Sequence, residues 1–132
     1  MKQITHDWLE AAGLDIESIG YLLPNERLTG HVAFLSQQAI EKSLKAFIEE
    51  KGERVPKIHS LSKLFDLCAG WIDIYIDDNL IIALDSLYIE SRYPGEFGLL
   101  PEGKPTTEQS QLFFDFAKDV YSEIKYYLEK KA

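Results

Sequence analysis

Apolar side chains recur every three or four residues between Val32 and Lys51. The repeating positions are Ala33, Phe34, Ile40, Leu44, Phe47 and Ile48. This spacing is typical of a helix that buries one face in a hydrophobic core. We therefore predict a long helix from about Leu28 to Lys51, with Gly52 as its C-terminal cap.

A second periodicity runs through the same segment and is polar. Gln38, Glu41, Lys42 and Lys45 follow one another at helical spacing and form a second face. Such a ladder usually faces solvent, and here it favours ion pairing between Glu41 and Lys45 and a Gln38–Lys42 pair. The alternative is a polar network directed at another helix or at a second copy of the chain.

The flanking segments show the same helical pattern. The first predicted helix runs from Ile4 to Leu23, with Thr5 and Asp7 as candidate caps. Gly13 and Gly20 lie inside it, where each weakens a helix by about 1 kcal/mol relative to Ala. The two glycines indicate either close packing against a neighbouring helix or a fold that tolerates this loss of helix stability.

Three more helices complete the prediction. A short one follows Ser60 or Ser62 and ends at Gly70. A fourth ends at about Ser91, and a last one begins after Thr106 or Thr107 and continues to the end of the chain. Residues 71–78 alternate as a strand does, but no other segment resembles a partner strand, so we expect no sheet. The fold class is all-α, an antiparallel bundle of four long helices plus one short helix.

Composition and charge narrow the class of protein. The 132 residues suit a single domain, and 45% hydrophobic with 27% charged residues is ordinary for a globular protein. No apolar run is long enough to cross a bilayer and no signal peptide is visible, which predicts a cytoplasmic protein without a membrane partner. The net charge of −8 argues against broad, non-specific binding of nucleic acid. Cys68 lies in an apolar run and is expected to be a small core residue.

Candidate chemistry is sparse. The sequence has neither a phosphate-binding glycine motif nor paired metal ligands at helical spacing, so we expect no cofactor and no metal. His59 directly precedes a predicted helix, where its ring would cap free N–H groups. Arg92 follows Tyr88 by one turn and precedes Tyr93. At a helix C-terminus an arginine either complements the dipole or, between two tyrosines, binds a phosphate next to a stacking surface.

Several of these elements together resemble the HEPN domain, a nucleotide-binding family of higher eukaryotes and prokaryotes. The matching elements are Trp8-Leu9 with Ala12, Gln38-Ala39-x-Glu41-Lys42-x-x-Lys45-Ala46, His59-x-Leu61-x-x-Leu64 and Tyr88-Ile89-x-Ser91-Arg92-Tyr93-Pro94. The resemblance covers nearly the whole chain. It implies a helical bundle that forms a symmetric homodimer, and many prokaryotic members are encoded beside a minimal nucleotidyltransferase as a toxin–antitoxin pair.

The resemblance also bears on catalysis. Some members are metal-independent endoribonucleases that use an arginine and a histidine a few residues after it. Arg92 matches that arginine, but no histidine follows His59 in this sequence. We therefore expect nucleotide or RNA binding without catalysis, with Arg92, Tyr93 and Tyr88 as ligand-binding residues.

On this interpretation the polar ladder of Gln38, Glu41, Lys42 and Lys45 contributes to the same ligand site. The alternative is an endoribonuclease toxin in which Arg92 acts with a non-standard acid–base group, either Glu96 or His59. The segment from Tyr93 to Pro105 is expected to fold over the cleft, because its apolar residues would otherwise be exposed.

Overall fold

The computed structural model describes residues 1–91 and 104–131, without the side chains of residues 89–91 and 131. Throughout this part of the chain the regular structure is helical and no strand occurs. The elements are α1 (Gln3–Leu22), a short 3-10 helix η1 (Glu26–Leu28), α2 (Thr29–Glu50), α3 (Leu61–Cys68), α4 (Asp78–Ser91) and α5 (Thr107–Lys131). The predicted all-α bundle of four long helices and one short helix is confirmed.

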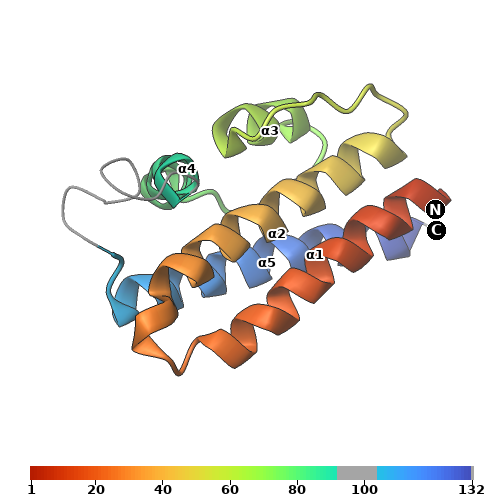
Figure 1. The fold of residues 1–132 in the computed structure, drawn as a ribbon. Helices are drawn as coiled ribbons and strands as arrows, with labels where there is room; N and C mark the ends of the chain where they lie inside the picture. The colour runs from red at the N-terminus through yellow and green to blue at the C-terminus, as the bar shows by residue number, and fades with distance from the viewer. Residues whose placement is uncertain (92–103, 132) are drawn as a thin grey trace.

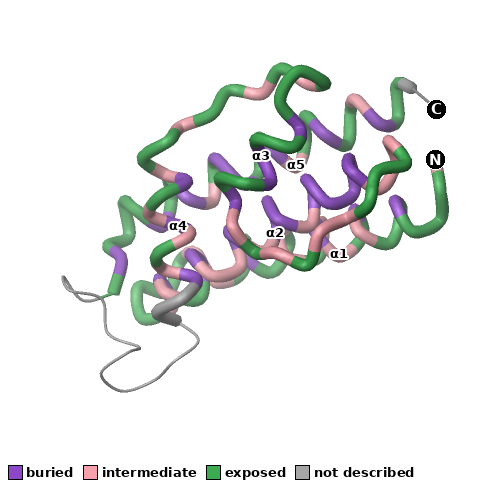
Figure 2. The backbone as a smooth tube through the Cα atoms, turned by 90° about the horizontal axis from the view of Figure 1, so that it is seen from above, coloured by how far each residue is buried: buried purple, intermediate pink, exposed green. Residues whose placement is uncertain are grey.

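The long helix α2 is the centre of the bundle. It contacts α1, α3, α4 and α5, and fourteen of its 22 residues are buried. Figure 2 shows buried positions along most of its length, whereas α1 and α5 alternate between buried and exposed turns. Polar side chains on α2 therefore find their hydrogen-bond partners on several other elements.

Two long helices pack along α2, and α4 crosses it (Figure 1). α1 runs antiparallel to α2, and α5 runs in the same direction as α2. The ends of α2 and α5 meet where Lys51 Nζ donates to Tyr127 Oη at 3.1 Å. The start of α1 lies at this same end of the bundle, where the Lys2 backbone N–H donates to the Glu50 carboxylate at 3.0 Å.

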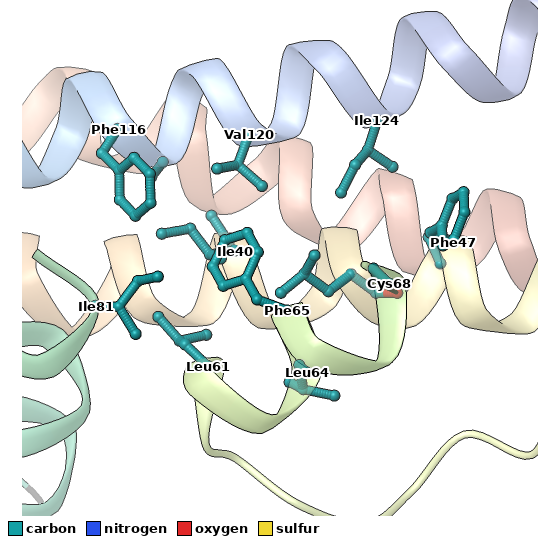
Figure 3. Close-up of a cluster of buried hydrophobic side chains, with 14 of the residues drawn as sticks. Ile40, Phe47, Leu61, Leu64, Phe65, Cys68, Ile81, Phe116, Val120 and Ile124 are labelled. Atoms are coloured by element: carbon teal, nitrogen blue, oxygen red, sulfur yellow. Dashed lines mark hydrogen bonds between the residues drawn. The ribbon is translucent and has the colours of Figure 1, made fainter. Parts of the chain in front are cut away.

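The apolar stripes predicted from the sequence meet in one core (Figure 3). Ile40 and Phe47 of α2 face Phe116, Val120 and Ile124 of α5, and α3 covers them with a further layer. The α3 residues of this layer are Leu61, Leu64, Phe65 and Cys68. Since α3 has only two turns, its position depends on this packing and on its N-terminal cap.

Most predicted caps are present. Gly52 and Gly70 have φ values of +79° and +87°, which glycine adopts without strain, and they follow α2 and α3. Thr106 and Gln109 form a reciprocal capping box at α5, with N···O distances of 2.9 and 3.1 Å. Ser60, rather than Ser62, caps α3 by accepting from the Lys63 N–H at 3.3 Å.

The predicted caps of α1 are wrong. The helix begins at Gln3, after Lys2, and Thr5 lies inside its first turn. Thr5 is fully buried, and its hydroxyl donates to the Glu50 carboxylate at 2.9 Å. The side chain is therefore used for a contact with α2 that is distant in sequence, which the local cap pattern around Thr5 and Asp7 does not reveal.

The strand-like segment is an extended connection. Residues 72–77 have no regular structure, and Ile72 and Ile74 pack against the core while Trp71, Asp73 and Tyr75 are exposed. The alternation therefore reflects an extended chain lying on the bundle. It leads into α4, whose first turn is capped by Asp77 accepting from the Leu80 N–H at 3.2 Å.

Three predicted site residues lie outside the described part of the chain. They are Arg92, Tyr93 and Glu96. The same holds for most of the segment from Tyr93 to Pro105, so its expected position over a cleft remains a prediction.

Candidate functional site

A buried carboxylate, that of Glu41, is the centre of the polar groups predicted from the sequence. It lies in the middle of α2 and the residue is 5% exposed. Lys45 Nζ donates to Oε2 at 3.0 Å and Gln37 Nε2 donates to Oε1 at 3.1 Å. His59 Nδ1 lies 3.1 and 3.2 Å from the two carboxylate oxygens. Three donors therefore surround one carboxylate, and we refer to Gln37, Glu41, Lys45 and His59 as the Glu41 network.

The expectation that this face is solvated is wrong. Lys45 is 5% exposed, like Glu41, and its ammonium also lies 5.7 Å from the centre of the Trp8 ring on α1. The predicted Glu41–Lys45 pair does form, but in the interior. Two charges out of water must satisfy each other, because an unpaired buried charge costs several kcal/mol. The predicted pairing of Gln38 with Lys42 is absent, because Lys42 Nζ donates to Asp15 Oδ2 at 2.8 Å; Gln38 Nε2 donates to Gln37 Oε1 at 2.7 Å.

His59 joins the network from the connection before α3. Its backbone carbonyl accepts from Gln37 Nε2 at 2.8 Å, so both its main chain and its ring are fixed to α2. An ionised carboxylate only accepts hydrogen bonds, so Nδ1 is the donor in the contact with Glu41. The side chain is 51% exposed, and Nε2 has no hydrogen-bond partner among the described residues. The network therefore presents one imidazole nitrogen, in a fixed orientation, at the surface.

The predicted capping role of His59 is taken by other groups. Asp85 of α4 accepts from the Leu61 N–H at 2.9 Å and from the Ser62 N–H at 3.4 Å. With Ser60, it satisfies the first turn of α3. A carboxylate suits the positive end of a helix, and here it also ties α3 to α4.

The side chain of Tyr88 lies next to this imidazole. Its ring centre is 5.2 Å from that of His59 and 5.6 Å from that of Phe34, with which it stacks at an interplanar angle of 5°. Tyr88 is buried, and the stacked Phe34 ring covers one face of its ring. Tyr88 precedes Arg92 by one helical turn in sequence, and the Glu41 network is therefore next to the end of α4 that leads to Arg92.

Lys42 points to a different neighbour. Its ammonium contacts Asp15 of α1 at 2.8 Å. Burial raises the pKa of the Asp15 carboxyl above its ordinary value, and the hydrogen bond and charge of Lys42 oppose that shift. Of the residues predicted to share a ligand site, the structure thus brings together Gln38, Glu41, Lys45 and Tyr88, while Lys42 pairs with Asp15 of α1. His59, predicted only as a helix cap and as an acid–base group of the ribonuclease alternative, lies among them.

Sequence reasoning did not identify Gln37 and Asp85 as parts of this site. Gln37 precedes Glu41 by four residues, as Glu41 precedes Lys45, so the helical spacing of 37, 41 and 45 was a usable signal. No local pattern signals Asp85, because its partners belong to a different helix.

Other candidate chemistry is limited. Cys68 is buried in the core, as predicted, and burial raises its pKa to about 12, which disfavours the thiolate, the nucleophilic form. Within residues 1–91 and 104–131, no group of three His, Cys, Asp or Glu side chains is placed to hold a metal ion. No helix in the same part of the chain has the length and apolar character required to cross a membrane.

The fold and the site define a class: an all-helical bundle whose central helix carries a buried polar network. The profile of the HEPN domain matches residues 5–127, and the chain belongs to this family. A crystal structure, that of TT1696 from Thermus thermophilus, has a similar fold with a TM-score of 0.70. The alignment covers 94% of this chain and 98% of that one at 24% identity, so it shows the fold alone. A comparison with curated proteins finds no match.

Proposed function

We propose that this HEPN-type module binds a nucleotide or RNA without cleaving it, as a homodimer that pairs with a minimal nucleotidyltransferase in a toxin–antitoxin-like system. The observation that carries the binding proposal is the fixed imidazole of His59, whose ring lies beside that of Tyr88. Tyr88 in turn precedes Arg92 by one helical turn in sequence. The pairing and the dimer rest on the family resemblance.

The proposed roles follow from the chemistry of each group. The guanidinium of Arg92 binds a phosphate, since its planar fork matches two phosphate oxygens. Tyr93 supplies a stacking surface for a base. Glu41 and Lys45 position His59 rather than contact the ligand, because each is buried and already paired.

Titration at low salt tests binding. A fluorescently labelled single-stranded RNA oligonucleotide is added to the protein, and AMP and ATP are then used as competitors. Arg92→Ala should weaken affinity by about 10- to 150-fold, the effect of losing a charge-assisted phosphate contact of about 1.5–3 kcal/mol. Arg27→Ala is the control, since Arg27 is an exposed arginine on η1. Equal affinities of both variants, or no affinity of the unmodified protein, would refute the proposal.

The dimer and the partner have separate tests. Analytical ultracentrifugation of the purified chain should give twice the monomer mass of 15.1 kDa. Co-expression with a minimal nucleotidyltransferase encoded next to it should yield a complex that survives purification. A monomer, or a neighbouring gene of another class, would remove the corresponding part of the proposal.

The ribonuclease alternative is favoured by one observation, the Glu41–His59 contact. A histidine held by a carboxylate is a common form of general base. In this mechanism His59 Nε2 takes the proton of the ribose 2′-hydroxyl, and the 2′-oxygen then forms a bond to phosphorus. The bond from phosphorus to the 5′-oxygen breaks, and the leaving oxygen takes a proton from water. The products are a 2′,3′-cyclic phosphate and a 5′-hydroxyl end.

Labelled RNA incubated with the protein in EDTA distinguishes the two functions. The ribonuclease alternative predicts these two product ends, their loss in His59→Ala, and partial recovery when free imidazole is added. The binding proposal predicts intact RNA throughout. Ser60→Ala changes the neighbouring residue and controls for damage to the connection before α3.

A further inference from the structure

A second polar and aromatic site lies at the C-terminal end of α2. A cavity of about 200 Å³ opens there between the last turn of α2, the connection that follows it, and the end of α3. Phe47 and Ile48 form its buried floor, and Leu67 and Trp71 form an exposed wall. Phe47 is thirteen residues after Phe34, the neighbour of Tyr88, or about 20 Å along the helix. Figure 1 likewise places α4 away from the C-terminal end of α2.

The positive charge at this cavity is not balanced by ion pairs. Lys51 Nζ lies 4.9 Å from the centre of the Trp71 ring and about as far from Phe47 and Tyr127 (5.3 and 5.1 Å). Its one hydrogen-bond partner among the described residues is the neutral Tyr127 hydroxyl. Arg54 lines the same cavity, is exposed, and forms no ion pair or hydrogen bond in the described part of the chain. Glu53 also lines it but forms no ion pair with either cation.

This pairing pattern is unusual for so acidic a chain. With a net charge of −8, carboxylates are abundant, yet two cations line this cavity and Glu53 is the one acidic residue in its lining. The C-terminal end of α2 carries a partial negative charge, and other groups satisfy its carbonyls. Lys2 Nζ donates to the Glu49 carbonyl at 2.9 Å, and the Lys51 N–H donates to the Phe47 carbonyl at 3.1 Å. The charge on Arg54 is therefore not needed for the helix end.

The aromatic wall is fixed in place. Gly70 has a φ of +87°, which turns the chain after α3, and the Trp71 N–H donates to the Cys68 carbonyl at 3.1 Å. The Trp71 residue is 55% exposed, so its indole combines contact with Lys51 and accessible surface. An exposed indole next to two cations suits a flat ring that carries an anion, because the ring stacks and the anion meets the charges.

We propose that this cavity binds a nucleoside monophosphate, with its base against Trp71 and its phosphate between Lys51 and Arg54. The lining has two positive groups and one negative group, a balance that suits a single phosphate better than a triphosphate chain. The volume admits one planar ring rather than an oligonucleotide. The site is separate from the Arg92 region and stands or falls independently of the proposed function.

Indole N–H signals in a two-dimensional proton–nitrogen NMR spectrum test this assignment. The chain has two tryptophans, so Trp71→Phe identifies the Trp71 signal and leaves that of Trp8. AMP is titrated into the labelled protein, with adenosine and inorganic phosphate as separate arms and ATP as a fourth. We expect a saturable shift of the Trp71 signal with AMP, an affinity at least 5-fold weaker for ATP and for each of the two fragments, and no shift of Trp8.

Matched variants locate the phosphate. Arg54→Gln should weaken AMP binding at least 5-fold, whereas Arg27→Gln, at the opposite end of α2, should leave it unchanged. Lys51→Met should weaken binding similarly, and its thermal melt shows whether it folds. Arg92→Ala should have no effect at Trp71, which separates this site from the proposed function. Any one of three results would overturn the proposal. They are a Trp71 signal that does not move over the whole AMP titration, equal affinities for AMP and adenosine, and an unchanged affinity for AMP in Arg54→Gln.

Discussion

Replacing Glu41 by glutamine is expected to destabilise the protein by about 3–5 kcal/mol. The substitution keeps the shape of the side chain and removes its charge. Lys45 then remains 5% exposed and loses its anionic partner at 3.0 Å. Breaking a buried ion pair from one side has this cost because the remaining charge is not compensated. For a domain of this size the loss corresponds to roughly 10–20 °C in the melting temperature.

Urea denaturation followed by circular dichroism measures the free energy of unfolding, and two further variants are compared with Glu41→Gln. Glu129→Gln on α5 is the matched control, because Glu129 pairs with Lys125 at the same helical spacing, 3.8 Å apart and with both side chains about half exposed. It should cost less than about 0.5 kcal/mol. The double variant Glu41→Gln with Lys45→Met removes both charges and should regain most of the lost stability.

The reasoning fails on either of two results. If Glu41→Gln costs no more than Glu129→Gln, the Glu41 network behaves as a solvated pair in spite of its burial. If the double variant is as unstable as the single one, the loss arises from packing or from His59 and not from the unpaired ammonium. A double-mutant cycle separates these contributions.

Three further outcomes follow from local features. Gly20→Ala should raise the free energy of unfolding by about 0.5–1 kcal/mol, since beyond its chain neighbours and the nearby backbone of its own helix nothing lies within 4 Å of the added Cβ. Gly13→Ala should gain less, because its Cβ would lie 2.8 Å from the Tyr121 hydroxyl; urea titrations compare the two. The pKa of Glu50 is lowered below its ordinary 4.5, chiefly by a backbone hydrogen bond. Its contribution to stability is therefore present above pH 4.5 and lost as the pH falls through the lowered pKa, so melts between pH 3 and 6 should show a shallower acid slope in Glu50→Gln. Cys68, with a pKa of about 12, should resist a thiol reagent at pH 8 until urea unfolds the protein.

The helices were largely predictable because their signals are local. The predicted segment from about Leu28 to Lys51 differs by one residue at each end from α2, and the Thr106–Gln109 capping box is present as expected. A repeat of apolar residues, or a glycine that ends a helix, can be recognised from residues that are near one another in sequence. The same is true of the extended segment 72–77, whose lack of a partner strand was visible in the sequence.

The environment of the polar face was not predictable in the same way. Glu41 and Lys45 have the spacing of a solvated pair, and hydropathy alone assigns them to the surface. Their burial depends on Trp8 of α1 and on His59, which is eighteen residues from Glu41 in sequence. The cap that Asp85 provides to α3 and the contact from Thr5 to Glu50 are long-range in the same sense. Such contacts require the arrangement of the helices to be known first.

The meeting of α1 and α5 at one end of α2 has a consequence for chain connectivity. Lys2 contacts Glu50 and Tyr127 contacts Lys51, so both ends of the described chain reach the last turn of the central helix. A short flexible linker could therefore join them, and new termini could be opened at the exposed Gly52–Arg54 segment. In such a circular permutant α5 would precede α1 directly, which shortens the sequence separation of its contacts with α1 and α2, whereas the contacts of α2 with α3 and α4 become more distant in sequence. These two changes oppose each other, so the folding rate should change little while the Glu41 network stays intact.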